Sequence, residues 1–311
     1  MDEGLKARFT GFLIFFSTIW KTDLLAHRSP IIFVLLASFF FASSTFVAKM
    51  AGVGFFGSPI HPLQVTHSRF VFGLITVLIM FLLFDREKFV RPNFCLHIAR
   101  ATFGFLGVSI MFSGVVYLPA SDAISLSFMN PIFAMFFATI LLGEQVGKYR
   151  WFGAFCAFIG AVILLRPEGW QANPIALMCI AGAAALGLEI VIIKILSGRE
   201  KPLQILVISN VIGSIIATAP LLFIGAVPQS TQWFALIAVG ALMAFGQLLF
   251  LLAMLRAEAS LVAPYIYTTL LFVMALDFAV LGVRPDFWSV AGAGIISCSG
   301  IFIAYREHKR E

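Results

Sequence analysis

Four charged side chains interrupt stretches of the chain that are otherwise almost wholly apolar: Lys49, Arg69, Glu189 and Lys194. A guanidinium can hold a carboxylate or a phosphate through two parallel hydrogen bonds, and a glutamate can hold a cation or a proton. Burying such a group is costly, so within an apolar segment it is a functional candidate by default. The alternative for Lys49 and Lys194 is that their side chains extend from near a segment end to the membrane surface. The alternative for Arg69 is a structural ion pair.

Glu189 is the one carboxylate deep in such a segment. It calls for a cationic partner or a bound proton. Lys194 follows five residues later, which on a helix turns it ~140° away from Glu189. We therefore expect Glu189 to pair with Arg69 or Lys49 in one conformation and to part from it in another. The alternative is that Glu189 binds a coupling proton.

A second group of candidates is uncharged. Pro131 and Pro264 lie inside apolar segments, and a proline in a helix frees the carbonyl one turn earlier, which in lipid needs a partner or a wet cavity. Polar side chains near these prolines and in other apolar segments could line a cavity for a small molecule: Asn130, Asn210, Gln247, Tyr265, Tyr267 and Thr268. The alternative is that they hydrogen-bond between helices.

Signatures of several other chemistries are missing from the sequence. Its histidines form no His-x-x-x-His pair, and no Gly-x4-Gly-Lys-Ser/Thr phosphate loop occurs. The four cysteines show neither metal-ligand spacing nor a disulfide framework. We therefore predict no cofactor, no metal and no catalytic residue. His61, His67 and Arg69 together are the only hint of an intramembrane enzyme.

The elements that position these residues must face lipid rather than water. Of the 311 residues, 61% are hydrophobic and 12% are charged, whereas roughly 25% are charged in a soluble protein. The net charge of +6 does not indicate nucleic acid as a partner, because the basic residues form no long tract. The composition predicts an all-α membrane protein in contact with the lipid bilayer.

Ten segments are long and apolar enough to span a bilayer, which takes about 20 residues each. They cover roughly residues 31–53, 62–84, 97–118, 121–142, 148–166, 174–196, 203–224, 232–254, 260–281 and 286–305. The loops between them are too short for a soluble domain. Gly11–Trp20 is too short to cross, so we expect an interfacial helix within the N-terminal segment 1–29, with a signal peptide as the alternative.

The basic residues in the loops and near the ends of the spans are distributed unevenly. If the N-terminus is cytoplasmic, sixteen fall on that side: Lys6, Arg8, Lys21, Arg28, Arg86, Lys88, Arg91, Arg100, Lys148, Arg150, Arg199, Lys201, Arg256, Arg306, Lys309 and Arg310. Only Arg166 and Arg284 fall on the other. This bias predicts a cytoplasmic (inner) membrane protein with both termini in the cytoplasm.

The two halves of the chain resemble each other at a shift of 139 residues. Leu142–Gly143 then coincides with Leu281–Gly282, and Gly153–Ala154 with Gly292–Ala293. We predict a first repeat at 30–168, a second at 169–306 and a short tail at 307–311. Repeats of five spans must insert with opposite orientation, and two inverted five-helix repeats are typical of secondary carriers.

Two stretches carry a resemblance to a known family. They are Leu118–Gly153 (LPASDAISLSFMNPIFAMFFATILLGEQVGKYRWFG) and Ala257–Gly292 (AEASLVAPYIYTTLLFVMALDFAVLGVRPDFWSVAG). Their order of small-Ser, mid-helix proline, leucines and glycine is similar to that of the ten-helix EamA-type carriers in the drug/metabolite transporter superfamily. Arg69 also resembles an arginine of that family. The second half departs from the pattern at Val283, where the family often has the glutamate represented here by Glu144.

The resemblance implies transport of a small molecule, in a family whose members carry amino acids, nucleotide-linked metabolites, vitamins or amphipathic compounds. Three basic groups against one deep carboxylate suggest an anionic or zwitterionic substrate, and we expect a monomer or homodimer. The alternatives are a lipid flippase or amphipath exporter of the same fold, and a non-transporting membrane protein.

The charge bias generates a prediction about topology. In a variant without the native cysteines, Ser58→Cys in the loop 54–61 should react with an impermeant thiol reagent in intact cells, because that loop is expected outside. Glu311→Cys should react only after the cells are opened. The reverse labelling pattern would invert the predicted orientation.

Overall fold

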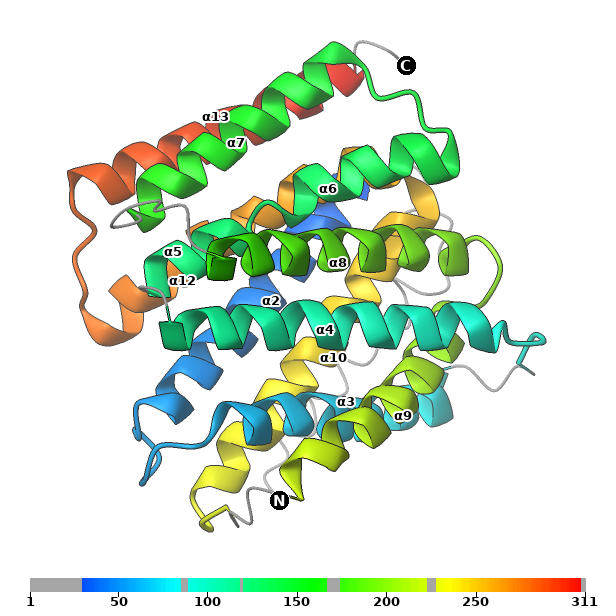
Figure 1. Cartoon of the computed structure of the whole chain (residues 1–311), viewed down its shortest axis with the longest axis vertical. Helices are drawn as coiled ribbons and strands as arrows, with labels where there is room; N and C mark the ends of the chain where they lie inside the picture. The colour runs from blue at the N-terminus through cyan, green and yellow to red at the C-terminus, as the bar shows by residue number, and fades with distance from the viewer. Residues whose placement is uncertain (1–29, 85–88, 118–119, 167–173, 223–227, 309–311) are drawn as a thin grey trace, which may run out of the picture.

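The computed structural model describes residues 30–84, 89–117, 120–166, 174–222 and 228–308, and the regular elements within these ranges are all helical (Figure 1). Within them, ten helical spans are long and apolar enough to cross a membrane, as the sequence predicts. The protein is therefore a multi-pass, all-α membrane protein. The interfacial helix expected within residues 1–29 lies outside the described residues.

Eight spans are single helices: α2 (Pro30–Gly52), α3 (Pro62–Phe84), α4 (Phe94–Tyr117), α7 (Lys148–Leu165), α8 (Pro174–Ser197), α9 (Pro202–Leu221), α10 (Gln232–Arg256) and α13 (Phe287–His308). The first two spans of each half begin with a proline, whose fixed φ and missing N–H suit the first turn of a helix. We call the end of the bundle with turns 143–147 and 198–201 the basic end; it lies on the right in Figure 1.

The fourth and ninth spans are broken near their prolines. The fourth consists of α5 (Ala120–Ser127), α6 (Asn130–Phe137) and the π-helix η2 (Ala138–Leu142). The ninth consists of α11 (Ala259–Val262), the 3-10 helix η3 (Ala263–Tyr267) and α12 (Thr268–Leu281). Each span ends at a glycine with positive φ, Gly143 at 69° and Gly282 at 66°, a conformation that terminates helices at little cost in glycine.

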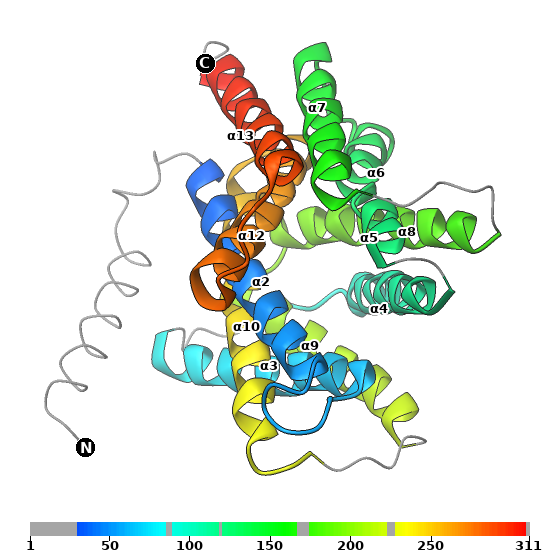
Figure 2. The ribbon, with the colours of Figure 1, turned by 90° about the vertical axis from the view of Figure 1, so that its left-hand side faces the viewer.

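The packing of the helices repeats between the two halves. Helix α2 lies against α10 as α8 lies against α4, and α12 lies against α2 as α6 lies against α8. The pairs α7–α13 and α3–α9 each join equivalent spans of the two halves, and both views show α7 close to α13 (Figures 1 and 2). The bundle is therefore built from two inverted five-helix repeats.

The two broken spans are joined by a buried hydrogen bond. The hydroxyl of Tyr267, whose side chain is fully buried, donates to the carbonyl of Phe128 at 2.8 Å. Phe128 lies in the break between α5 and α6, and its ring stacks on that of Tyr267. The break thus leaves a carbonyl without a continuing helix, and the other repeat supplies its donor.

At the basic end, Glu144 holds the start of the ninth span. Its two carboxylate oxygens accept the N–H groups of Ala259 at 2.8 Å and Ser260 at 2.9 Å. A carboxylate at a helix N-terminus satisfies orphan donors and the helix dipole. Arg150 reinforces this closure through an ion pair with Glu258 and a 2.9 Å hydrogen bond to Ser260.

The opposite end is held by more exposed ion pairs. Lys49 lies 2.8 Å from Asp277, and Arg166 pairs with Asp286. The hydrogen bond from Arg166 holds the pKa of the Asp286 carboxyl well below its usual range. Val283 occupies the place that corresponds to Glu144 and offers no side-chain acceptor. Exposed ion pairs of this kind contribute little to stability.

The Tyr267 hydrogen bond generates a prediction about stability. Tyr267→Phe should lower the stability of the detergent-solubilised protein by about 1–3 kcal/mol, because the carbonyl of Phe128 loses its buried donor. Tyr149→Phe removes the hydroxyl of an exposed tyrosine and serves as the control. Thermal unfolding midpoints measure both, and equal midpoints for the two variants would show that the bond between the broken spans contributes nothing.

Candidate functional site

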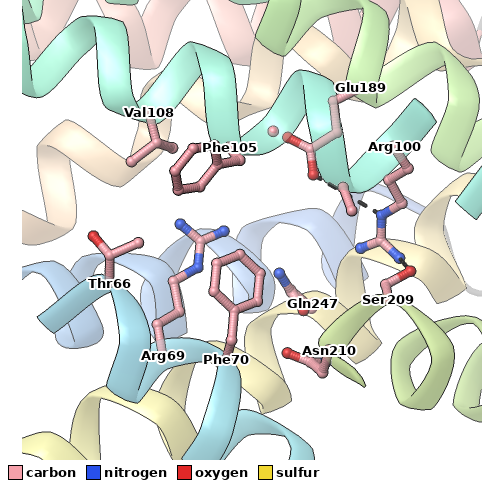
Figure 3. A pocket seen from close by; sticks show the side chains of 12 residues that line it. Thr66, Arg69, Phe70, Arg100, Phe105, Val108, Glu189, Ser209, Asn210 and Gln247 are labelled. Atoms are coloured by element: carbon pink, nitrogen blue, oxygen red, sulfur yellow. Dashed lines mark hydrogen bonds and ion pairs between the residues drawn. The ribbon is translucent and has the colours of Figure 1, made fainter. Parts of the chain in front are cut away.

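A cavity of about 150 Å³ lies among the two broken spans and helices α2, α3, α4, α8 and α10. A smaller pocket adjoins it toward α9, and the two share Arg69, Arg100, Glu189 and Gln247. Apolar walls surround these polar groups: Phe41, Leu186, Ile190, Ile193, Met243, Phe250, Leu251 and Ile266. Figure 3 shows both guanidinium groups and the carboxylate pointing into one space.

Arg69 enters the site from α3. Its Nε is buried and has no hydrogen-bond partner, and its guanidinium carbon lies 5.6 Å from the centre of the Phe70 ring. Burying an N–H of a charged group without an acceptor is costly. The Nε of Arg69 is therefore a hydrogen-bond donor without an acceptor. Arg69 itself lines the cavity.

Arg100 is the second cation of the site, contrary to its predicted place among the basic loop residues. Helix α4 begins at Phe94, so Arg100 lies almost two turns inside it and is only 3% exposed. Its Nη1 donates to the hydroxyl of Ser209 at 2.6 Å, and its Nε lies 3.9 Å from Oε1 of Glu189. Packing of α4 against α8 and α9 turns this residue inward.

The Glu189 carboxylate fits into space left by a glycine. A Cβ at Gly104 of α4 would lie 2.9 Å from Cδ and Oε2 of Glu189. Contacts under 3.0 Å are essentially never found for real Cβ atoms. Gly104 therefore positions the carboxylate beside Arg100, one turn away on the same helix.

The ion pairing of Glu189 differs from the expectation. The cation nearest its carboxylate is Arg100 rather than Arg69 or Lys49, and Lys49 is engaged with Asp277. Lys194 donates instead to the carbonyls of Met254 and Ala257, at 2.6 and 2.7 Å. Two guanidinium groups against one carboxylate leave the site with one positive charge in excess.

Five of the nine predicted site residues line the cavity or the pocket that adjoins it: Arg69, Asn130, Glu189, Asn210 and Gln247. Asn130 begins α6 directly after the break, and its buried Oδ1 has no hydrogen-bond partner. Asn210 uses its amide nitrogen on the carbonyl of Leu206 at 2.8 Å. Asn130, which lines the cavity, therefore carries a buried acceptor without a partner.

The other four predicted residues do not line the cavity. Lys49 lies at the opposite end of the bundle, and Tyr267 bonds to Phe128. The Tyr265 hydroxyl donates to the carbonyl of Gly300 at 3.0 Å, and Thr268 donates to the carbonyl of Tyr265 at 2.6 Å. These bonds match the alternative interpretation of the cluster as hydrogen bonding within and between helices.

Arg100, Ser209 and Gly104 were missed by reasoning from the sequence. Arg100 and Gly104 are spaced by four, and His97 and Arg100 by three, which places all three on one helix face. This spacing was a usable sign that Arg100 shares a helix face with His97 and Gly104. Ser209 carried no signal, since a lone serine in an apolar helix is common.

Two long stretches of the chain, residues 28–166 and 173–306, match the EamA-like transporter family. The chain belongs to this family. As an EamA-like protein it is a membrane transporter of a small molecule and not an enzyme. Its two matched stretches correspond to the two inverted repeats of the bundle.

Individual relatives of this EamA-like protein have several cargoes. It is 26% identical over 255 residues, 82% of this chain and 87% of the relative, to an S-adenosylmethionine uptake transporter of Rickettsia prowazekii. It is 31% identical to a riboflavin transporter of Rhizobium johnstonii (69% and 72% covered) and 24% identical to a pseudopaline exporter of Pseudomonas aeruginosa (86% and 93%). A crystal structure matches its fold with a TM-score of 0.74 at 17% identity, covering 89% of this chain and 99% of that one.

The fit between Gly104 and Glu189 generates a prediction. Gly104→Ala should leave the fold intact, because the carboxylate is the flexible end of a side chain, but should displace it from Arg100 and reduce transport. Gly294→Ala is the control, since a Cβ there meets nothing within 4 Å. Transport in proteoliposomes of any substrate that the wild type carries is compared for the two, and equal rates would exclude a positioning role for Gly104.

Proposed function

We propose that this EamA-like protein carries a small anionic or zwitterionic metabolite across the cytoplasmic membrane by alternating access, with both termini in the cytoplasm. The observation that carries the proposal is that Arg69 lines the cavity with Arg100 and Glu189, and that its buried Nε has no acceptor. A carboxylate or phosphate of the substrate would supply the missing acceptor and balance the excess positive charge.

The free acceptor of Asn130 supports the zwitterionic form of this proposal. Its Oδ1 is buried without a partner, and Glu189 lines the same cavity. An ammonium or amide N–H of the substrate would satisfy such an oxygen. A substrate with an anionic group at Arg69 and a donor group at Asn130 therefore meets both unsatisfied atoms.

The position of the cavity supports alternating access. The cavity, about 150 Å³ in volume, lies inside the bundle among the two broken spans and five other helices. Helices must part for a substrate to enter. Glu144 and Arg150 close the basic end across the two broken spans, so opening there requires these bonds to break.

The relatives do not fix the cargo, because they are named for S-adenosylmethionine, riboflavin and pseudopaline, and for both uptake and export. Coupling to a proton at Glu189 stays a prediction. The first experiment is therefore a panel of radiolabelled S-adenosylmethionine, riboflavin, methionine, glutamate and choline, measured by counterflow into proteoliposomes. The proposal expects a zwitterion or anion to be carried and choline to be refused; uptake of choline alone would overturn it.

Substitution of Arg69 tests the observation on which the proposal depends. Arg69→Ala should lower transport of the best panel substrate about 100-fold. This corresponds to the ~3 kcal/mol that is lost when one partner of a buried charge pair is removed. Arg69→Lys should keep part of it, because an ammonium retains the charge and loses the planar fork. Lys148→Ala, at an exposed cation, is the control. Wild-type rates in Arg69→Ala, with unchanged thermal stability, would leave Arg69 without a role in binding.

A further inference from the structure

A buried chain of hydrogen bonds connects Arg100 with the basic end of the bundle. His97 lies on α4 one turn before Arg100 and is 0% exposed. Its Nδ1 lies 3.4 Å from the Ser209 hydroxyl, which also accepts from Arg100 at 2.6 Å. Its Nε2 lies 2.9 Å from Oε2 of Glu200, in the turn between α8 and α9. The substrate cavity is thus linked through three side chains to a turn between spans.

Glu200 is held in place as an acceptor. Besides His97, its Oε2 accepts from Nε2 of Gln204 at 2.7 Å, and its Oε1 accepts from the N–H of Asn93 at 2.8 Å. Gln204 in turn bonds to both the N–H and the carbonyl of Val90, at 2.8 and 2.9 Å. An ionised carboxylate has only acceptors to offer and suits three donors.

The donors and acceptors of this chain are all satisfied by one placement of the protons. Arg100 can only donate, so the oxygen of Ser209 accepts and its hydroxyl proton is free for Nδ1 of His97. Glu200 can only accept, so Nε2 of His97 carries the proton that it receives. Every group is satisfied when His97 is neutral with its proton on Nε2.

Protonation of His97 would disrupt this arrangement. A proton on Nδ1 would face Ser209, whose own hydroxyl proton would lose its acceptor, and a second cation would stand beside Arg100. The charged groups that face the chain are Glu200 from the α8–α9 turn, Arg100 on α4 and Glu189 on α8 beyond Arg100. Both effects weaken the bond between Arg100 and Ser209.

We propose that His97, Ser209 and Glu200 are positioning residues for Arg100, and that protonation of His97 releases Arg100 from its place in the cavity. This inference rests on the proposed function, because it makes the grip on an anionic group sensitive to pH. Glu200 adjoins the basic end, proposed to be cytoplasmic, so protons would act from that side.

The test compares the KM of counterflow for the panel metabolite that the wild type carries fastest, between about pH 8 and pH 5, the range in which imidazoles titrate. The wild-type KM should rise about tenfold as pH falls, because a change of this size is expected when one hydrogen bond to a charged group is lost. His97→Gln, which does not titrate, should show a flat KM over this range. Ser209→Ala should have the raised KM at every pH, and Ser209→Thr, which keeps the hydroxyl, should restore the lower value.

The chain offers a matched control in a second histidine. His67 of α3 lies 3.1 Å from the hydroxyl of Thr218 on α9, the same pairing of imidazole and hydroxyl, but neither residue lines the cavity. His67→Gln and Thr218→Ala should keep the wild-type pH profile. In the Ser209→Ala background, His97→Gln should cause no further change in KM, because the link is already cut.

A second measurement needs no substrate. In protein with 15N-labelled histidine, the His97 signals, assigned by their loss in His97→Gln, should show protonated Nε2 and bare Nδ1 at high pH. Neutral His97 with its proton on Nδ1, or equal pH profiles of KM for the wild type and His97→Gln, would overturn the inference. If the wild type carries no panel metabolite, the proposed function fails instead, and the tautomer still decides the hydrogen-bond chain.

Discussion

The burial of three charges inside an apolar bundle is the constraint on which the rest of this structure depends. Arg69, Arg100 and Glu189 lie where lipid-facing helices offer little to solvate them, and desolvation is tolerated only with compensating bonds. Arg100 has a serine and a nearby carboxylate, and that carboxylate has the space that Gly104 leaves. Of these three charged groups, Arg69 keeps a buried atom without a hydrogen-bond partner, and the proposal that a ligand binds beside it depends on this atom.

The two ends of the bundle are held by different contacts. At the basic end the buried Glu144 closes the ninth span with two short bonds to its backbone, and Arg150 adds an ion pair. The opposite end has Val283 at the equivalent position and relies on exposed pairs such as that of Lys49. A symmetric architecture therefore carries an asymmetric set of closures.

Family and cavity answer different questions about function. Belonging to the EamA-like transporters establishes transport, yet the relatives are named for unrelated cargoes. Only the side chains in the cavity restrict the chemistry, through an excess positive charge and a free amide oxygen at Asn130. In the proposed mechanism, the hydrogen bonds from Glu200 through His97 to Ser209 let the pH at the basic end affect the position of Arg100.

The sequence by itself determined the ten spans, and it singled out the two prolines within spans together with Arg69 and Glu189 as candidates. Span length, proline geometry and the cost of burying charge are local properties, and each is visible in a single segment. The tertiary structure decided which groups meet. It turned Arg100 inward and tied Tyr267 to the neighbouring break, because the facing of a side chain depends on helix rotation, and rotation is set by packing against other spans.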